Sequence, residues 1–165
     1  MLPQPLHPAV VHFPIVLTLL MPLVAAGAWL AVRRGARPAR MWPLVAGTAL
    51  LLFASTFVAQ RTGEAEEEVV ERVVPESAIG QHEESAERYL IATGVFVLLA
   101  AIGLAPGRLG RAGRVAGLAG AVALIPLAWS VGHSGGELVY QHGAASAYVT
   151  SGAPAATARA EHEER

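Results

Sequence analysis

The chain contains no cysteine, no lysine and no aspartate. Without cysteine it can form neither a disulfide framework nor a thiolate metal site. All positive side-chain charge is therefore on arginine and all negative charge on glutamate. Charged residues are also scarce, at 15% of the 165 residues, whereas soluble domains carry about 25%. Together with a hydrophobic fraction of 53%, this scarcity indicates an integral membrane protein.

Recognisable catalytic motifs are missing as well. His82-Glu83 has no second histidine at the spacing of a zinc-protease helix, and the sequence has no P-loop or dinucleotide fingerprint. No pairing of a serine with a histidine and an acid is recognisable. These absences favour a binding or electron-transfer protein over an enzyme, and nothing indicates a nucleic-acid partner.

Four uncharged stretches are long enough to cross a membrane as helices. They are residues 8–32, 41–60, 89–107 and 115–136. A hydrocarbon core of ~30 Å requires about 20 helical residues. The sequence therefore predicts an all-α fold, a four-helix transmembrane bundle in a bilayer, with a transmembrane domain over residues 1–143.

The distribution of charge predicts how the bundle is oriented. Connections 33–40 and 108–114 hold arginine and no acid, and short positive loops stay in the cytoplasm. Both termini are therefore expected outside it. Arginine follows the first apolar run but does not precede it, so we expect an uncleaved helix instead of a signal peptide. Four aromatic residues are expected as interfacial anchors: Trp29 and Trp42 at the inner boundary, and Tyr89 and Trp129 near the outer one.

The segments outside the spans are expected to be short or irregular. Residues 64–74 place valines on one helical face and glutamates on the other, which predicts a short amphipathic helix on the outer membrane face or capping the bundle. A new helix is expected from Ser77, and the fourth span is expected to continue to Gly143. The tail 144–165 is predicted to be disordered.

Small residues on the fourth span point to close packing, and no internal repeat is expected beyond the alternation of spans. Gly113, Gly117 and Ala121 follow one another at four-residue spacing. This spacing lets helix backbones approach closely. We interpret it as packing within the chain in preference to a homodimer.

Histidines gather at the predicted outer ends of the spans. The five that do so are His7, His12, His82, His133 and His142. We expect His12 and His133 at the hydrocarbon boundary on adjacent or facing helices, and the others in the outer aqueous layer. Glu137 follows His133 by one helical turn, where it can join a metal site or orient that histidine.

Imidazole ligates both metal ions and haem iron, so these histidines predict a cofactor site. The first hypothesis is a b-type haem in the outer half of the membrane, in a slot walled by Phe13 and Trp129 and bordered by three glycines, Gly132, Gly135 and Gly136. The second is a Zn, Fe or Cu(II) ion held by three or four of the five histidines and Glu137. The third is a cofactor-free structural or assembly subunit whose histidines hydrogen-bond the span ends.

Two segments, LHPAVVHFP (6–14) and GHSGGELVYQHG (132–143), resemble the signatures of an uncharacterised bacterial family of predicted four-span membrane proteins. Thr62-Gly63 and His82 extend the resemblance across most of the chain. Some members are associated with c-type cytochrome domains. The resemblance implies the five histidines as characteristic positions and a link to redox chains. We therefore expect residence in the bacterial inner membrane, and the haem hypothesis predicts a periplasmic or exported redox partner.

Overall fold

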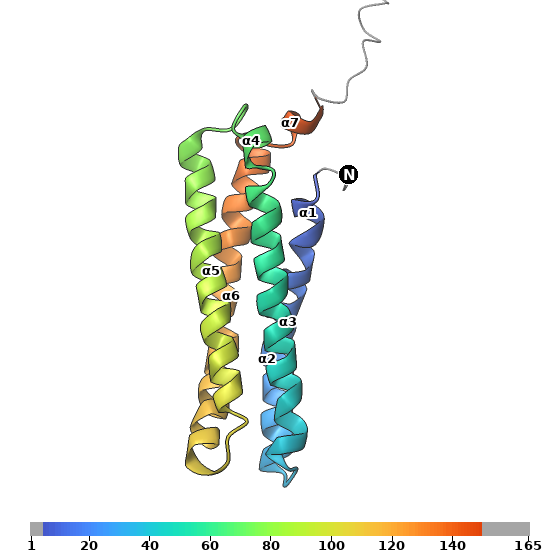
Figure 1. The fold of residues 1–165 in the computed structure, drawn as a ribbon, viewed down its shortest axis with the longest axis vertical. Coiled ribbons are helices and arrows are strands. Elements are labelled where there is room, and N and C mark those ends of the chain that lie inside the picture. Colours follow the sequence, from blue (N-terminus) through green and yellow to red (C-terminus); the bar gives the residue numbers. More distant parts are fainter. Residues whose placement is uncertain (1–4, 150–165) are drawn as a thin grey trace, which may run out of the picture.

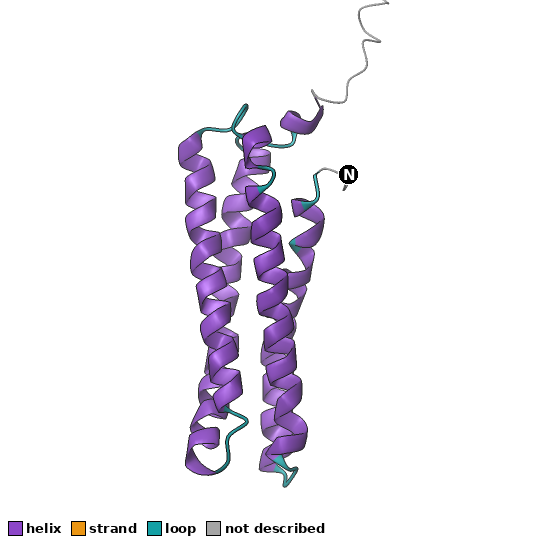
Figure 2. Cartoon of the chain, in the orientation of Figure 1, coloured by secondary structure: helices purple, strands orange, loops and turns teal. Residues whose placement is uncertain are grey.

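The computed structural model describes residues 5–149, and their regular structure is helical throughout (Figures 1 and 2). The elements follow the chain in this order: α1 (His7–Val10), α2 (His12–Arg33), α3 (Pro38–Glu64), α4 (Glu67–Val70), α5 (Glu76–Ile102), α6 (Gly107–Tyr140) and α7 (Ser146–Val149). Four helices are long and apolar enough to cross a membrane, and α1 and α2 together make the first. The prediction of an all-α four-span bundle is confirmed.

The long helices form an antiparallel bundle in which α2 and α5 each pack against α3 and α6. Helices α2 and α5 therefore face each other across a diagonal. The turns between α2 and α3 and between α5 and α6 lie at one end of the bundle, which we call the arginine end. α1, α4, α7 and both ends of the described chain lie at the other, which we call the acidic end (Figure 1).

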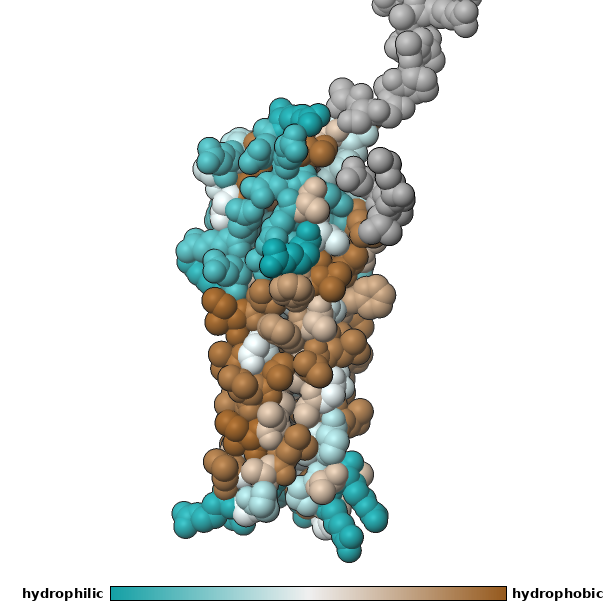
Figure 3. Space-filling view, viewed as in Figure 1, coloured by the Kyte–Doolittle hydropathy of each residue, from teal (hydrophilic) through white to brown (hydrophobic). Residues whose placement is uncertain are grey.

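The helices begin before the predicted apolar stretches. The third span was predicted at 89–107, but α5 begins at Glu76 and ends at Ile102. Twenty-seven residues make a helix of about 40 Å at 1.5 Å per residue, longer than the hydrocarbon core. Figure 3 shows the consequence, a hydrophobic band between two hydrophilic ends. The helix expected from Ser77 is confirmed, and its first turns project beyond the apolar band.

Two of the four predicted interfacial aromatics lie instead in the core. Trp42 is fully buried and donates a hydrogen bond of 2.9 Å from Nε1 to the carbonyl of Ala100. A Cβ atom at Gly103 would lie 2.1 Å from Nε1 of Trp42. Tyr89 is also buried, so the expected belt is wrong at both positions. The indole lies inside because a neighbouring glycine leaves room and a helix carbonyl accepts its N–H.

Small residues on α6 confirm the prediction of close packing within the chain. A Cβ at Gly113 would lie 2.5 Å from the backbone nitrogen of Gly103, and one at Gly117 would lie 3.2 Å from the Trp42 ring. Ala121 is fully buried. Helices α5 and α6 can approach this closely only because α6 presents no side-chain bulk there.

At the acidic end, residues 64–74 form less helix than predicted. Helix α3 runs on to Glu64, α4 is a single turn, and Val74 then packs with Ile79 and Ala144 in a small second core. The segment therefore caps the bundle, one of the two predicted arrangements. Gly143 has φ of 70°, and Ala144 N–H bonds the carbonyl of Leu138 at 2.9 Å, which ends α6 near the predicted position.

The expectation of a disordered tail over 144–165 is wrong at its start. Ala144 and Ala147 are buried, and Ser146–Val149 form the helical turn α7. The rest of that predicted segment, 150–165, lies outside the described residues.

Candidate functional site

His7 lies at the start of α1 with its ring against the last turns of α3. Its Nδ1 is 2.8 Å from the carbonyl oxygen of Ala59 and 3.3 Å from Oγ1 of Thr62. A carbonyl oxygen only accepts hydrogen bonds, so Nδ1 carries the proton in the neutral ring. The lone pair of His7 is therefore on Nε2.

His82 lies on α5, and its ring contacts α6 in the way that the ring of His7 contacts α3. Its Nδ1 is 3.0 Å from Oγ of Ser134, and Oγ donates its own proton to the carbonyl of Val131 at 3.1 Å. Because that hydroxyl proton is committed, Oγ accepts from Nδ1–H of His82. The ring also has a hydrogen bond with the backbone of Val131. His82, like His7, keeps its lone pair on Nε2.

These two imidazoles meet across the diagonal of the bundle. Their ring centres are 6.2 Å apart and their planes lie at 81°. Each ring packs on a glycine: a Cβ at Gly63 would lie 3.2 Å from Cε1 of His7, and one at Gly135 would lie 3.1 Å from Cε1 of His82. The bundle therefore brings together two oriented imidazoles, and among residues 5–149 their hydrogen bonds to side chains and carbonyls are made through Nδ1. We call this the imidazole pair.

The side chain of Glu66 forms hydrogen bonds with the backbone at the start of α1, where His7 lies. Its side chain is buried, and Oε1 accepts hydrogen bonds from the backbone N–H groups of Leu6 and of His7, the latter at 3.1 Å. These are donors that the start of a helix leaves without intrahelical partners. The other oxygen, Oε2, accepts from the hydroxyl of Tyr148 at 3.0 Å. Burial, and then the hydrogen bond to the Glu66 carboxylate, raise the pKa of Tyr148 to about 12.

Polar side chains continue from the imidazole pair into the bundle. The Tyr89 hydroxyl is hydrogen-bonded to Oγ1 of Thr18, which donates to the carbonyl of Pro14 at 2.7 Å. Thr56 and Thr93 are buried in the same part of the bundle and donate to carbonyls of their own helices. Towards the arginine end the core is apolar, with the following residues fully or almost fully buried: Met21, Val45, Leu52 and Phe96. The buried hydroxyls of the described residues thus gather towards the acidic end, whereas Arg114, which donates to the carbonyl of Gly103, is buried at the arginine end.

The predicted pair His12 and His133 is not formed. His12 is exposed, and its Nδ1 is 3.3 Å from Ala9 O of the same helical segment. His133 is exposed too, stacks on Trp129 with ring centres 6.5 Å apart, and has Nε2 3.4 Å from Oε1 of Glu137. The two residues lie on the adjacent helices α2 and α6, as expected, but each helix turns its histidine outward, so the two side chains do not converge on one site.

The slot expected for a haem is not formed by the predicted residues either. Phe13 is 68% exposed and Trp129 is 75% exposed, both on the outside of the bundle. Of the three predicted glycines, Gly132 and Gly136 face open space and Gly135 supports the ring of His82. His142 follows the end of α6, where its backbone N–H bonds the carbonyl of Glu137 at 3.1 Å.

Within residues 5–149 no three histidine, cysteine, aspartate or glutamate side chains gather as metal ligands would. The predicted set of three or four side chains on one ion is therefore not assembled. What the bundle provides is a set of two imidazoles. Sequence reasoning included both histidines but missed the hydroxyls of Thr62 and Ser134 that orient them, and the carboxylate of Glu66.

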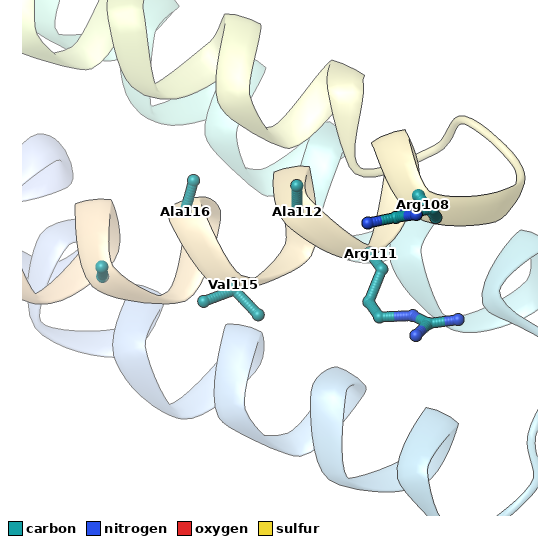
Figure 4. Close-up of a pocket in the computed structure, with 6 residues that line it drawn as sticks. Arg108, Arg111, Ala112, Val115 and Ala116 are labelled. Carbon is teal, nitrogen blue, oxygen red and sulfur yellow. The ribbon is translucent and has the colours of Figure 1, made fainter.

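A separate hollow lies on α6 at the arginine end, away from the imidazole pair. It is a shallow, open depression of about 560 Å³, lined by two arginines and four small or aliphatic residues: Arg108, Arg111, Ala112, Val115, Ala116 and Ala119. Figure 4 shows the two arginines at one end of a row of short side chains along α6. It contains no metal ligand or nucleophile.

Comparison with known proteins identifies a family and no function. Residues 3–147 match the model of a family described as predicted membrane protein (DUF2231). No curated protein matches the chain. No solved structure matches it either.

Proposed function

We propose that this chain, which belongs to the DUF2231 family of predicted membrane proteins, binds a b-type haem through His7 and His82 and serves electron transfer. The observation that carries the proposal is the imidazole pair. Its Nδ1 atoms are committed to helix carbonyls and hydroxyls, and its ring centres are 6.2 Å apart. Two imidazoles bound through Nε2 on opposite sides of one ion have ring centres roughly 6 Å apart, given metal–nitrogen bonds of about 2.0–2.1 Å.

The number of donors favours haem over a bare ion. A structural or catalytic zinc site uses three or four protein ligands, whereas haem iron needs only axial ligands from the protein because the macrocycle supplies the others. In haem and metal sites alike, histidine ligands donate their other ring N–H to a carbonyl or a neighbouring side chain, which fixes the ring. When bound, the haem supplies one-electron chemistry, and the chain's own residues hold and orient the two imidazoles.

A bare Zn, Fe or Cu(II) ion is the second candidate. It is favoured by the edge-to-face packing of the two rings, because an ion between them requires no separation of the helices. A macrocycle would require α3 and α6 to move apart on either side of it. Such a site would complete its coordination with water or an exogenous ligand and would serve sensing, storage or transfer of the ion.

The charge distribution supports a location outside the cytoplasm for this site. The turns at the arginine end carry arginines and no acid, while glutamates gather around α4 and the start of α5. By the positive-inside rule the arginine end faces the cytoplasm of a bacterial inner membrane. The imidazole pair, at the acidic end, then faces a periplasmic or exported redox partner.

The experiment is an absorbance spectrum of the detergent-purified protein, oxidised and dithionite-reduced, with elemental analysis of the same sample. We expect a Soret band that shifts on reduction and one iron per chain. Both features should be lost in His7→Ala and His82→Ala and retained in His12→Ala and His133→Ala, the matched exposed controls. Stoichiometric metal without a Soret band would show that the site binds a bare metal ion instead of haem.

Failure would take one of two forms. Protein without haem or metal, even after supplementation with haemin or zinc, would refute cofactor binding and leave a structural subunit. Loss of the band in the exposed variants but not in His7→Ala or His82→Ala would refute the assigned ligands. Circular dichroism and size-exclusion chromatography of each variant separate loss of ligand from loss of fold.

A further inference from the structure

We infer that the imidazole pair consists of two equivalent half-sites. Each half-site belongs to one of two helix hairpins that repeat the same structure. The first hairpin comprises α1 to α3 and the second comprises α5 and α6. This inference deepens the proposed function and rests on it where it concerns a bound metal. The equivalence itself is visible in the cofactor-free protein, so the two can fail separately.

The half-sites have the same parts in the same relation. In the first, His7 approaches Thr62 Oγ1 and Ala59 O, and Thr62 donates to Ala59 O at 2.8 Å. In the second, Ser134 takes the place of Thr62 and donates to the carbonyl three residues before it, that of Val131. In both, the histidine bonds that hydroxyl and that backbone segment.

The residue after each hydroxyl is a glycine that supports the ring. A Cβ at Gly63 would lie 3.2 Å from Cε1, 3.3 Å from Nδ1 and 3.8 Å from Nε2 of His7. The matching distances from Gly135 to His82 are 3.1, 3.5 and 3.8 Å. The two rings therefore lie on their glycines by the same edge and in the same orientation. An accidental pairing of two histidines would not reproduce a second set of contacts.

The equivalence continues down the first helix of each hairpin. Thr18 and Met21 lie as many residues after His7 as Thr93 and Phe96 lie after His82. All four residues are buried. On the second helix of each hairpin, buried residues also correspond, and the two members of each pair are separated by the same number of positions in the chain. The pairs are Ala49 with Ala121, Leu52 with Leu124, Val45 with Gly117, and Trp42 with Arg114. Three of these six pairs are identical in residue type and three differ, so common burial, more than residue type, reveals the repeat.

The arrangement of the helices fits a two-fold axis along the bundle. Such an axis exchanges α2 with α5 and α3 with α6, which lie on the two diagonals. It also superimposes the two arginine-rich turns at one end of the bundle. Parallel repeats related by an axis along the membrane normal are a known principle of membrane-protein architecture. This inference replaces the expectation of no internal repeat with a structural repeat of two hairpins.

The repeat assigns a function to Thr62 and Ser134. Ser134 accepts from Nδ1–H of His82, and Thr62 Oγ1 lies 3.3 Å from Nδ1 of His7 beside the Ala59 carbonyl, so in both rings the lone pair stays on Nε2. They are positioning residues for a ligand that receives two equivalent nitrogen donors. Outer-shell partners of this kind typically contribute 10–100-fold to metal affinity.

The test measures the imidazole tautomers directly by ¹⁵N NMR of histidine-labelled protein in detergent, purified without cofactor. Both His7 and His82 should show a protonated Nδ1 and an unprotonated Nε2. Ser134→Ala should perturb only His82, and Thr62→Val only His7, whereas the exchanged variants Ser134→Thr and Thr62→Ser should retain both signals. Thr48→Val is the matched control, because the Thr48 hydroxyl donates to a helix carbonyl on an exposed face.

The second readout is binding of haemin, or of Zn²⁺ where haemin does not bind. Thr62→Val and Ser134→Ala should each weaken affinity about 10–100-fold and by similar factors, and the exchanged variants should not. Opposite tautomers in the two rings, or a loss confined to one of the two hydroxyl variants, would overturn the inference. If the two histidines have equivalent tautomers but the protein binds neither haemin nor Zn²⁺, the result would support the repeat and refute the proposed function.

Discussion

The hydroxyl of Tyr148 donates a hydrogen bond of 3.0 Å to Oε2 of Glu66, while Oε1 of the same carboxylate accepts from the backbone N–H of His7 at 3.1 Å. One buried side chain between α3 and α4 therefore joins α7 to α1. Because His7 is one of the two residues of the imidazole pair, this carboxylate connects the stability of the acidic end to the geometry of the site.

Removing the carboxylate should destabilise the acidic end. Glu66→Ala leaves the N–H groups of Leu6 and His7 and the Tyr148 hydroxyl without their acceptor, at an expected cost of about 1–3 kcal/mol. Glu64→Ala is the control, because Glu64 forms an exposed pair with Arg61 and such pairs contribute about 0–1 kcal/mol. Unfolding in detergent measures both variants. An equal effect at the two positions would contradict the structural role of Glu66.

Alkaline pH should release the contact between Tyr148 and Glu66. The folded pKa of Tyr148 is raised to about 12, above the value of ~10 for an unfolded tyrosine. Its contribution to stability is therefore complete below pH ~10 and declines as pH rises from there through about 12. Wild type and Tyr148→Phe, unfolded in parallel at several pH values above 9, should converge in this window. A difference that is constant with pH would refute the assignment.

Adjacent glycines on α6 should respond differently to the same substitution. Gly136→Ala faces open space and should stabilise the helix by up to about 1 kcal/mol. Gly135→Ala places its methyl group 3.1 Å from the His82 ring, so it should gain less or lose stability and should displace the imidazole. Thermal unfolding of the pair, together with the ¹⁵N signals of His82, measures both effects. Identical behaviour of the two variants would mean that the ring does not lie on Gly135.

The arginine end should tolerate no side chain at Gly103. A methyl group there would lie 2.1 Å from Nε1 of Trp42, so Gly103→Ala should displace the indole and break its hydrogen bond to Ala100. We expect a loss of about 1–3 kcal/mol from overpacking and a further ~1 kcal/mol from the hydrogen bond. Gly47→Ala, in open space on α3, should be neutral or stabilising. Unfolding in detergent compares the two variants, and a neutral Gly103→Ala would contradict the buried position of Trp42.

The comparison of prediction with structure shows where sequence reasoning reaches its limit. Four spans, the arginine-rich turns and the close packing of Gly113 and Gly117 followed from length, charge and spacing. The imidazole pair did not, because His12 was expected with His133 at the hydrocarbon boundary, and His7 and His82 in the outer aqueous layer. Val11 keeps helical dihedrals between α1 and α2, and residues five apart on a helix lie about 140° apart around its axis, so His12 faces outward when His7 faces inward.

The sequence by itself determined that this protein spans a membrane, because it has four uncharged stretches long enough to cross the hydrocarbon core and too few charged residues to shield them from water. The asymmetry of its arginines and glutamates likewise distinguished the two ends of the bundle. Only the tertiary structure decided which histidines meet. A histidine at the end of a span is tolerated either at the interface or inside, and the rotation of each helix about its axis selects between them. That rotation depends on packing between helices, where Gly63 and Gly135 leave room for the rings of His7 and His82 and the hydroxyls of Thr62 and Ser134 orient them.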